Sequence, residues 1–259
     1  AVLKVARVNE YVGPYVERAF ADLIADGFMR VIYGGGADIG EYACRLPGVH
    51  QVHLTGSLST CQALIWGPGQ EGADRRAAGR PLLGKPFTGE LGNVGPVIVV
   101  PGQWSERALR LRAEDVATQI VQNDGFNCNA CRVLVLAEGW PQRERFLDHL
   151  RRVLAARPPR PAFHPGSEAE YDRYLAAHHG AEILGERRPG VLPPALVPSV
   201  DPAGDHLAFH EEGFIPLAVV TALPAGSPAE FLERAVAFCN ERLAGTLSAT
   251  LIVDGPTSR

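Results

Sequence analysis

The sequence predicts an α/β protein built on mostly parallel sheets. Short apolar or alternating segments, typical of strands, alternate along the chain with segments whose apolar residues recur at helical spacing. Strands alternating with helices imply right-handed crossovers and a parallel sheet. A chain of 259 residues can bury a sizeable core. A boundary near Gly92 leads us to expect two α/β layers, at residues 1–92 and 93–259.

The elements of the first layer follow in strand–helix order. Apolar residues at helical spacing between Tyr15 and Ile24, with Gly27 behind them, predict a helix after the first strand. Ser57 or Ser59 is expected to cap a later helix, and the polar residues 70–80 are expected to form a mobile insertion. The expected strands are 1–6, 29–36, 49–56 and one beginning near residue 85, and the expected helices are 14–27, 38–46 and 57–67.

The second layer repeats this alternation. Val133 to Leu136 is an apolar run that predicts a buried strand. A proline-rich stretch turning helical is expected at 157–180, and a proline-spaced loop leading into a strand at 193–223. Trp66 and Trp104 are expected in the core rather than in a pocket. The other expected strands are 96–100, 131–139 and 247–255, and the other expected helices are 110–124, 144–156 and 228–245.

Charge and composition exclude several classes of protein. A net charge of −4 provides no basic field for nucleic acid or an anionic membrane. No apolar run reaches the roughly 18 residues of a membrane helix, and the N-terminus lacks the pattern of a secretion signal. Five cysteines without framework spacing favour reduced thiols in a cytoplasm. Because both chain ends lie in strand-like segments, we expect a fragment of a longer protein.

Three short stretches carry residues suited to chemistry. A strand followed by Gly56 and Ser57 at a helix start can hold a phosphate, although turns of this kind are common. Glu90 lies among glycines between two apolar strands, where we expect it to be poorly solvated and suited to general-base work. A turn glutamate that caps backbone amides is the other interpretation. Cys128, flanked by two asparagines in a turn, is a candidate nucleophile.

Cys128 also forms a CxxC pair with Cys131, which raises two alternatives. A tetrahedral zinc site needs four ligands, and the sequence has no second CxxC. The adjacent His178 and His179 cannot easily share one site, and His206 and His210 lie on a segment expected to lead from a loop into a strand. We therefore expect no metal. A disulfide between the two cysteines could form under oxidation, and it would block the nucleophile rather than define a function.

In chain order, "VHLTGS", "FTGELGNVGP" and "NDGFNCNA" resemble motifs of the aldehyde dehydrogenase superfamily. Its members show a strand ending in F-T-G-S, a general-base glutamate in E-L-G-G and a nucleophile in N-x-G-Q-x-C-x-A. The resemblance implies Glu90 as the base and Cys128 as the nucleophile. It also implies NAD or NADP as cofactor, with Gly56 and Ser57 near its pyrophosphate. The family's fold further implies two Rossmann-like layers, with part of the NAD(P)-binding domain at residues 1–92 and the catalytic domain at residues 93–259.

Two further stretches extend the resemblance to both ends of the chain. "AVLKVA" looks like the family strand whose lysine touches the adenosine ribose, which assigns that role to Lys4. "EEGFIP" resembles E-x-F-G-P, whose glutamate holds the nicotinamide ribose. This implies Glu212 in that role, with Phe214 beside it. Arg7 stands where many members carry an acid, and it would attract the 2′-phosphate of NADP.

The chain departs from the family pattern at several positions. Asn93 replaces a glycine of E-L-G-G, Phe126 replaces the glutamine, and Cys61 stands where a later glycine is expected. Relatives also carry an N-terminal portion that completes the cofactor domain and supplies an oxyanion-hole asparagine, and a C-terminal portion with pocket residues and a pairing arm. In this chain alone the oxyanion hole would reduce to the Cys128 backbone N–H. A full-length protein is expected to be a homo-oligomer.

The resemblance implies an oxidoreductase that converts an aldehyde to a carboxylic acid through a cysteine hemithioacetal and a thioester. Glu90 disfavours acyl transfer to coenzyme A, because acylating members usually lack a base there. A non-catalytic, nucleotide-binding member of the same fold is the alternative, and cofactor-free ester hydrolysis by the same thiol is a third.

Overall fold

A computed structural model describes residues 1–34, 37–158 and 160–255. The chain forms two compact units, Ala1–Leu91 and Gly92–Arg259, and each is described by itself. Their functional assignment as cofactor and catalytic domains remains a prediction. Parallel strands joined by helices make up both units, which confirms the predicted α/β class.

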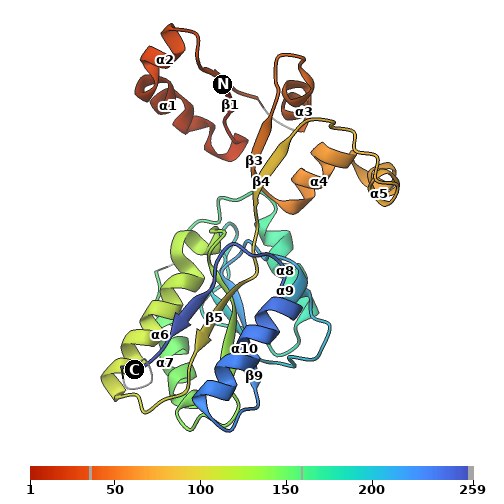
Figure 1. Cartoon of the computed structure of the whole chain (residues 1–259). Helices are drawn as coiled ribbons and strands as arrows, with labels where there is room; N and C mark the ends of the chain where they lie inside the picture. The colour runs from red at the N-terminus through yellow and green to blue at the C-terminus, as the bar shows by residue number, and fades with distance from the viewer. Residues whose placement is uncertain (35–36, 159, 256–259) are drawn as a thin grey trace. The chain divides into compact units, whose positions relative to one another are not determined.

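Unit 1 contains two parallel strand pairs with helices between them (Figure 1). β1 (Val2–Lys4) pairs with β2 (Arg30–Ile32), and β3 (Val52–Gly56) pairs with β4 (Phe87–Leu91). The predicted strand 29–36 is thus shorter, and its last two positions lie outside the described residues. The helices are η1 (Arg7–Val12, 3-10), α1 (Gly13–Ala19), α2 (Ala21–Ala25), α3 (Ala37–Arg45), α4 (Leu58–Trp66) and α5 (Gly69–Ala77).

The prediction of a mobile insertion at 70–80 was wrong, because most of this stretch is helix α5. Gly67 and Gly69 adopt positive φ angles of 96° and 61°, which lets the chain turn sharply between α4 and α5. Arg75 then donates to the Trp66 carbonyl at 3.3 Å and pairs with Glu71 one helical turn before it. These local contacts fix a helix whose sequence has no apolar periodicity.

Unit 2 is organised around one six-stranded sheet in the order β10-β5-β6-β9-β8-β7. Every neighbouring pair is parallel except β7 with β8. The strands are β5 (Gly95–Val99), β6 (Cys131–Ala137), β7 (Glu182–Ile183), β8 (Ala195–Val200), β9 (Leu217–Leu223) and β10 (Thr250–Ile252). β5, β6 and β9 are almost wholly buried, as expected for strands covered on both faces.

Helices cover both faces of this sheet (Figure 1). α6 (Glu106–Val121) and α7 (Arg143–Ala155) lie together on one side, and α10 (Pro228–Arg242) lies on the other. This arrangement follows from right-handed crossovers that run in opposite directions along the sheet. The shorter helices are η2 (Gln122–Gly125, 3-10), α8 (Ser167–Ala177) and α9 (Leu207–His210). No helix within the described ranges is long and apolar enough to cross a membrane.

The expectation of a plain loop before the strand near residue 217 was wrong. Residues 195–200 form β8, and residues 207–210 form α9. The apolar start of β8 pairs with β9, while Pro198 lies where the pairing register shifts between Val197 and Val200. A proline is tolerated in a strand at such an irregularity, because no ladder hydrogen bond is lost there.

Candidate active site

Cys128 lies in the turn between α6 and β6. Three consecutive residues ahead of it, Asn123, Asp124 and Gly125, adopt left-handed backbone conformations with φ of 51°, 60° and 75°. Such conformations cost energy at non-glycine residues and persist only where the surroundings enforce them. The Cys128 side chain is half-buried, and its Sγ lies 4.0 Å from Asn127 Oδ1. The thiol is therefore neither sealed in the core nor freely exposed.

The turn that carries Cys128 rests against the segment Glu212–Pro216. A side chain at Gly125 would collide with the backbone of Ile215 and Pro216, so glycine is required there for the close approach. The ring of Phe126 lies 5.9 Å from that of Phe214 between centroids. The structure thus brings three residues predicted from sequence, Cys128, Glu212 and Phe214, into one region of unit 2.

Glu212 is half-buried and has one unusual feature. Its Oε1 atom is buried without a hydrogen-bond partner in the described part of the chain. Burial raises the pKa of this carboxyl, while the charge of Arg132 and the donated backbone N–H of Asn93 lower it. A side chain at Gly92 would meet the Glu212 carboxylate, which would have to move to admit it. Glu212 Oε1 is therefore a buried acceptor whose hydrogen-bonding capacity is unused within the described residues.

Arg132 is a site residue that the sequence reasoning missed. It is 4% exposed, and its guanidinium donates to the carbonyls of Ile215 at 2.5 Å and of Gly125 at 2.6 Å. Burial lowers the pKa of Arg132, and nearby acidic groups, Glu212 first, oppose this. The signal was a charge at the start of the apolar strand β6, where a buried arginine needs partners.

A second, partly buried arginine contacts the start of the turn. Asp124 is 2% exposed and forms an ion pair with Arg157. Burial raises the pKa of Asp124, whereas Arg157 lowers it. The pair anchors the left-handed residues that precede Cys128.

Two residues that depart from the family pattern, Phe126 and Asn93, make contacts within unit 2. Phe126 packs in an aromatic cluster with Phe163, His164 and Phe214, at centroid distances of 4.8, 5.6 and 5.9 Å. Burial lowers the pKa of His164. Asn93 is 2% exposed and bonds through Nδ2 to Ser248, while its Oδ1 accepts from the Leu247 N–H. Both residues therefore stabilise the local backbone.

The five cysteines differ in accessibility. Cys131 is 1% exposed, and burial raises its pKa to about 12. Cys61 is also buried, whereas Cys44 and Cys239 are half-buried. All five thiols are free. Within the described ranges, no group of three or more His, Cys, Asp and Glu side chains could hold a metal ion.

Glu90 lies in unit 1, on β4, directly opposite Thr55 of β3. Its neighbour Leu91 pairs with Gly56, so Glu90 stands next to the turn that leads into α4. The expectation of poor solvation was wrong, because Glu90 is exposed along an edge of a two-stranded sheet. The backbone places this carboxylate without burying it.

The other predicted cofactor residues also lie in unit 1. Ser57, rather than Ser59, caps α4, and its Oγ accepts from the Thr60 N–H at 3.1 Å. Gly56 ends β3 immediately before it. Lys4 is half-buried, and its Nζ lies 3.4 Å from the Val5 carbonyl. Arg7 is exposed at the start of η1.

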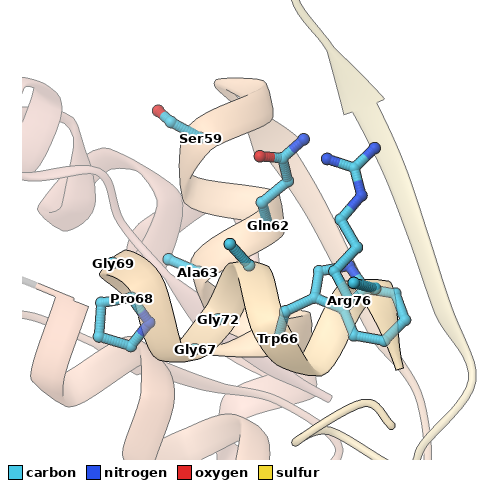
Figure 2. A pocket seen from close by; sticks show the side chains of 11 residues that line it. Ser59, Gln62, Ala63, Trp66, Gly67, Pro68, Gly69, Gly72 and Arg76 are labelled. Carbon is cyan, nitrogen blue, oxygen red and sulfur yellow. The ribbon is translucent and has the colours of Figure 1, made fainter. Parts of the chain in front are cut away.

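A pocket of about 610 Å³ opens between α4 and α5 of unit 1. Figure 2 shows Gln62 and Arg76 extending their polar ends to the same side, with the Trp66 ring below them. Trp66, which was expected in the core, is half-buried and lines this pocket. Trp104 is 7% exposed and belongs to the core of unit 2, as expected.

The chain belongs to the aldehyde dehydrogenase family, whose model matches residues 1–235. This confirms the resemblance inferred from the motifs. A comparison with curated protein sequences gave no significant match.

Solved structures of this family share the fold of the chain. A lactaldehyde dehydrogenase from Escherichia coli matches with a TM-score of 0.72 at 21% identity, over 99% of this chain and 52% of that one. An NADP-dependent glyceraldehyde-3-phosphate dehydrogenase from Bacillus halodurans, complexed with NADP, matches with a TM-score of 0.70 at 19% identity, over 98% and 55%. An NAD-dependent aldehyde dehydrogenase from Sinorhizobium meliloti matches with a TM-score of 0.70 at 20% identity, over 98% of this chain and 54% of that one. The chain thus spans about half the length of these relatives.

Proposed function

We propose that the protein oxidises an aldehyde to a carboxylic acid with NAD or NADP. Family membership supports the reaction class. The observation that carries the proposal is the half-buried Cys128 thiol, held in a strained turn against the segment with Glu212 and Phe214. A structural cysteine would need no such turn, whereas a nucleophile must be held in place and remain accessible.

In this reaction the Cys128 thiolate attacks the aldehyde carbon and forms a carbon–sulfur bond, which gives a hemithioacetal. Loss of the carbon-bound hydrogen as hydride leaves a thioester on Cys128. Glu90 then takes a proton from water, and the resulting hydroxide attacks the thioester carbon. The carbon–sulfur bond breaks, the acid leaves, and the thiolate is restored.

Several residues fit a nicotinamide dinucleotide, which supplies the hydride acceptor when bound. Glu212 has a buried, unpartnered carboxylate oxygen within the described chain, as needed to accept from a ribose hydroxyl. Ser57 caps α4, a helix of nine residues whose N-terminus favours a phosphate, and Gly56 directly precedes it. Lys4 is assigned to the adenosine ribose, and the exposed Arg7 to the 2′-phosphate that distinguishes NADP.

The proposal extends to a cytoplasmic protein that acts on a small aldehyde and associates with copies of itself at full length. Five free thiols fit a reducing compartment. Neither nucleic acid nor a membrane is a proposed partner, because the net charge is −4.

The test is turnover by the full-length protein. We expect reduced nicotinamide to form from short and long aldehydes with NAD or NADP, and Cys128→Ser to abolish it. Arg7→Ala should weaken NADP binding and leave NAD binding unchanged. If no aldehyde yields reduced cofactor although NAD or NADP binds, the protein is a non-catalytic member of the family. Ester hydrolysis that is indifferent to the cofactor would favour a simple thiol hydrolase.

A further inference from the structure

Arg132 joins two segments that lie far apart in the sequence. Its Nη1 donates to the Ile215 carbonyl at 2.5 Å, and its Nη2 donates to the Gly125 carbonyl at 2.6 Å and the Asn127 carbonyl at 3.3 Å. Two of these acceptors belong to the Cys128 turn and the third to the segment after Glu212. A planar guanidinium donates in several fixed directions at once, which a lysine ammonium does not do.

The surroundings of Arg132 make this contact specific. The side chain is 4% exposed, and its guanidinium carbon lies 5.9 Å from the Phe214 ring centre. The acidic or ionisable groups that face it are Glu212, Tyr174, Cys131 and Cys128. A buried cation is costly unless its donors are used. The Nη1 and Nη2 atoms of Arg132 donate to the carbonyls of both segments, whereas its Nε is buried without a hydrogen-bond partner among the described residues.

We propose that Arg132 is a positioning residue: its guanidinium locks the Cys128 turn onto the Glu212–Pro216 segment, so that thiol and carboxylate keep one relative arrangement. This inference rests on the proposed roles of Cys128 and Glu212. It requires the several fixed N–H donors of the guanidinium, and not only its positive charge.

The test measures alkylation of Cys128 by iodoacetamide in the full chain, read by peptide mass spectrometry. Arg132→Lys keeps the positive charge but loses the branched N–H donors of the guanidinium, so we expect the rate of Cys128 alkylation to fall about tenfold. Arg234→Lys on α10, whose parent residue pairs with Glu230 on the surface, is the matched control and should leave the rate unchanged. An unchanged rate in Arg132→Lys would overturn the proposal.

The buried Cys131 serves as an internal control for folding, because general loosening would expose it to the reagent. If Arg132 positions the turn, Cys131 should stay protected from iodoacetamide in Arg132→Lys. Modification of Cys128 and Cys131 at similar rates would instead show that Arg132 has only a structural role. Glu212→Gln is then combined with Arg132→Lys. We expect the rate of the double variant to differ by at least about threefold from the product of the single effects. Strictly multiplicative effects would contradict coupling through Arg132.

A measurement on the unsubstituted chain covers the case in which Arg132→Lys does not fold. Carboxymethylation of Cys128 should change the hydrogen exchange of amides in residues 212–218 by about threefold or more. Unchanged exchange there would refute the link between the segments. Because these assays need neither aldehyde nor cofactor, their failure is distinguishable from a failure of the proposed dehydrogenase activity.

Discussion

Thr55 and Glu90 are directly opposed on the parallel strands β3 and β4. The pairing places the carboxylate next to the Thr55–Ser57 turn, although 34 residues separate the two in the chain. Sequence motifs predicted both residues separately, and the strand pairing places them side by side. Glu90 is exposed, so water can reach the carboxylate that the proposed reaction uses as its base.

Glu90→Gln should therefore uncouple the two halves of the proposed reaction. We expect one rapid turnover to reduced nicotinamide, followed by a steady-state rate lower by roughly 100- to 10,000-fold, because water is no longer activated at the thioester. Stopped-flow absorbance with intact-protein mass spectrometry would detect the accumulating acyl enzyme. Glu114→Gln on α6 is the control, and an unchanged steady-state rate in Glu90→Gln would remove this role.

Selective chemistry at Cys128 is the next expectation. Burial raises the pKa of the other four thiols, to about 12 at Cys131 and about 11 at Cys239. Iodoacetamide at neutral pH should therefore label Cys128 first, since thiolates react and buried thiols do not. Time-resolved peptide mapping would measure this order. Faster labelling of Cys239 or Cys44 would show that the Cys128 turn is closed in solution.

The sequence was informative where local patterns decide the structure. Apolar runs between helical segments predicted strands β5, β6, β9 and β10 of unit 2, but not β7 and β8. The helix-start pattern limited the N-cap of α4 to Ser57 or Ser59. Helix α5 was missed because glycine turns and an Arg75–Glu71 pair, not apolar periodicity, support it. The role of Arg132 depends on carbonyls up to 83 positions away, which no local pattern specifies.

Asn93 also contacts residues far away in the sequence, which no local pattern specifies, and these contacts yield a stability prediction. Asn93→Ala removes hydrogen bonds to Ser248 and Leu247 from a buried position, so we expect unit 2 to lose about 1–3 kcal/mol. Urea unfolding can be followed by tryptophan fluorescence in a Trp66→Phe background, where Trp104 and Trp140 report on unit 2 alone. Ser248→Ala should cost much less, because the Ser248 carbonyl still accepts from Asn93. Equal losses in both variants would contradict the role of the Asn93 side chain.

The raised pKa of Glu212 predicts a pH dependence of folding stability that is opposite in sign to that of most carboxylates. Its folded-state pKa is raised, chiefly by burial, so the folded protein binds more protons than the unfolded chain between the two pKa values. The stabilisation is complete below the unfolded pKa and is lost as pH rises through the folded pKa. The free energy of unfolding of Glu212→Gln, relative to the parent chain, should therefore increase from acid to neutral pH.

Glu230 provides the opposite case, because the Gly226 N–H and Arg234 lower its pKa. The free energy of unfolding of Glu230→Gln, relative to the parent chain, should therefore decrease from acid to neutral pH. Urea titrations across this range would compare the two slopes, and a flat or falling difference for Glu212→Gln would show that its carboxyl is solvated rather than buried.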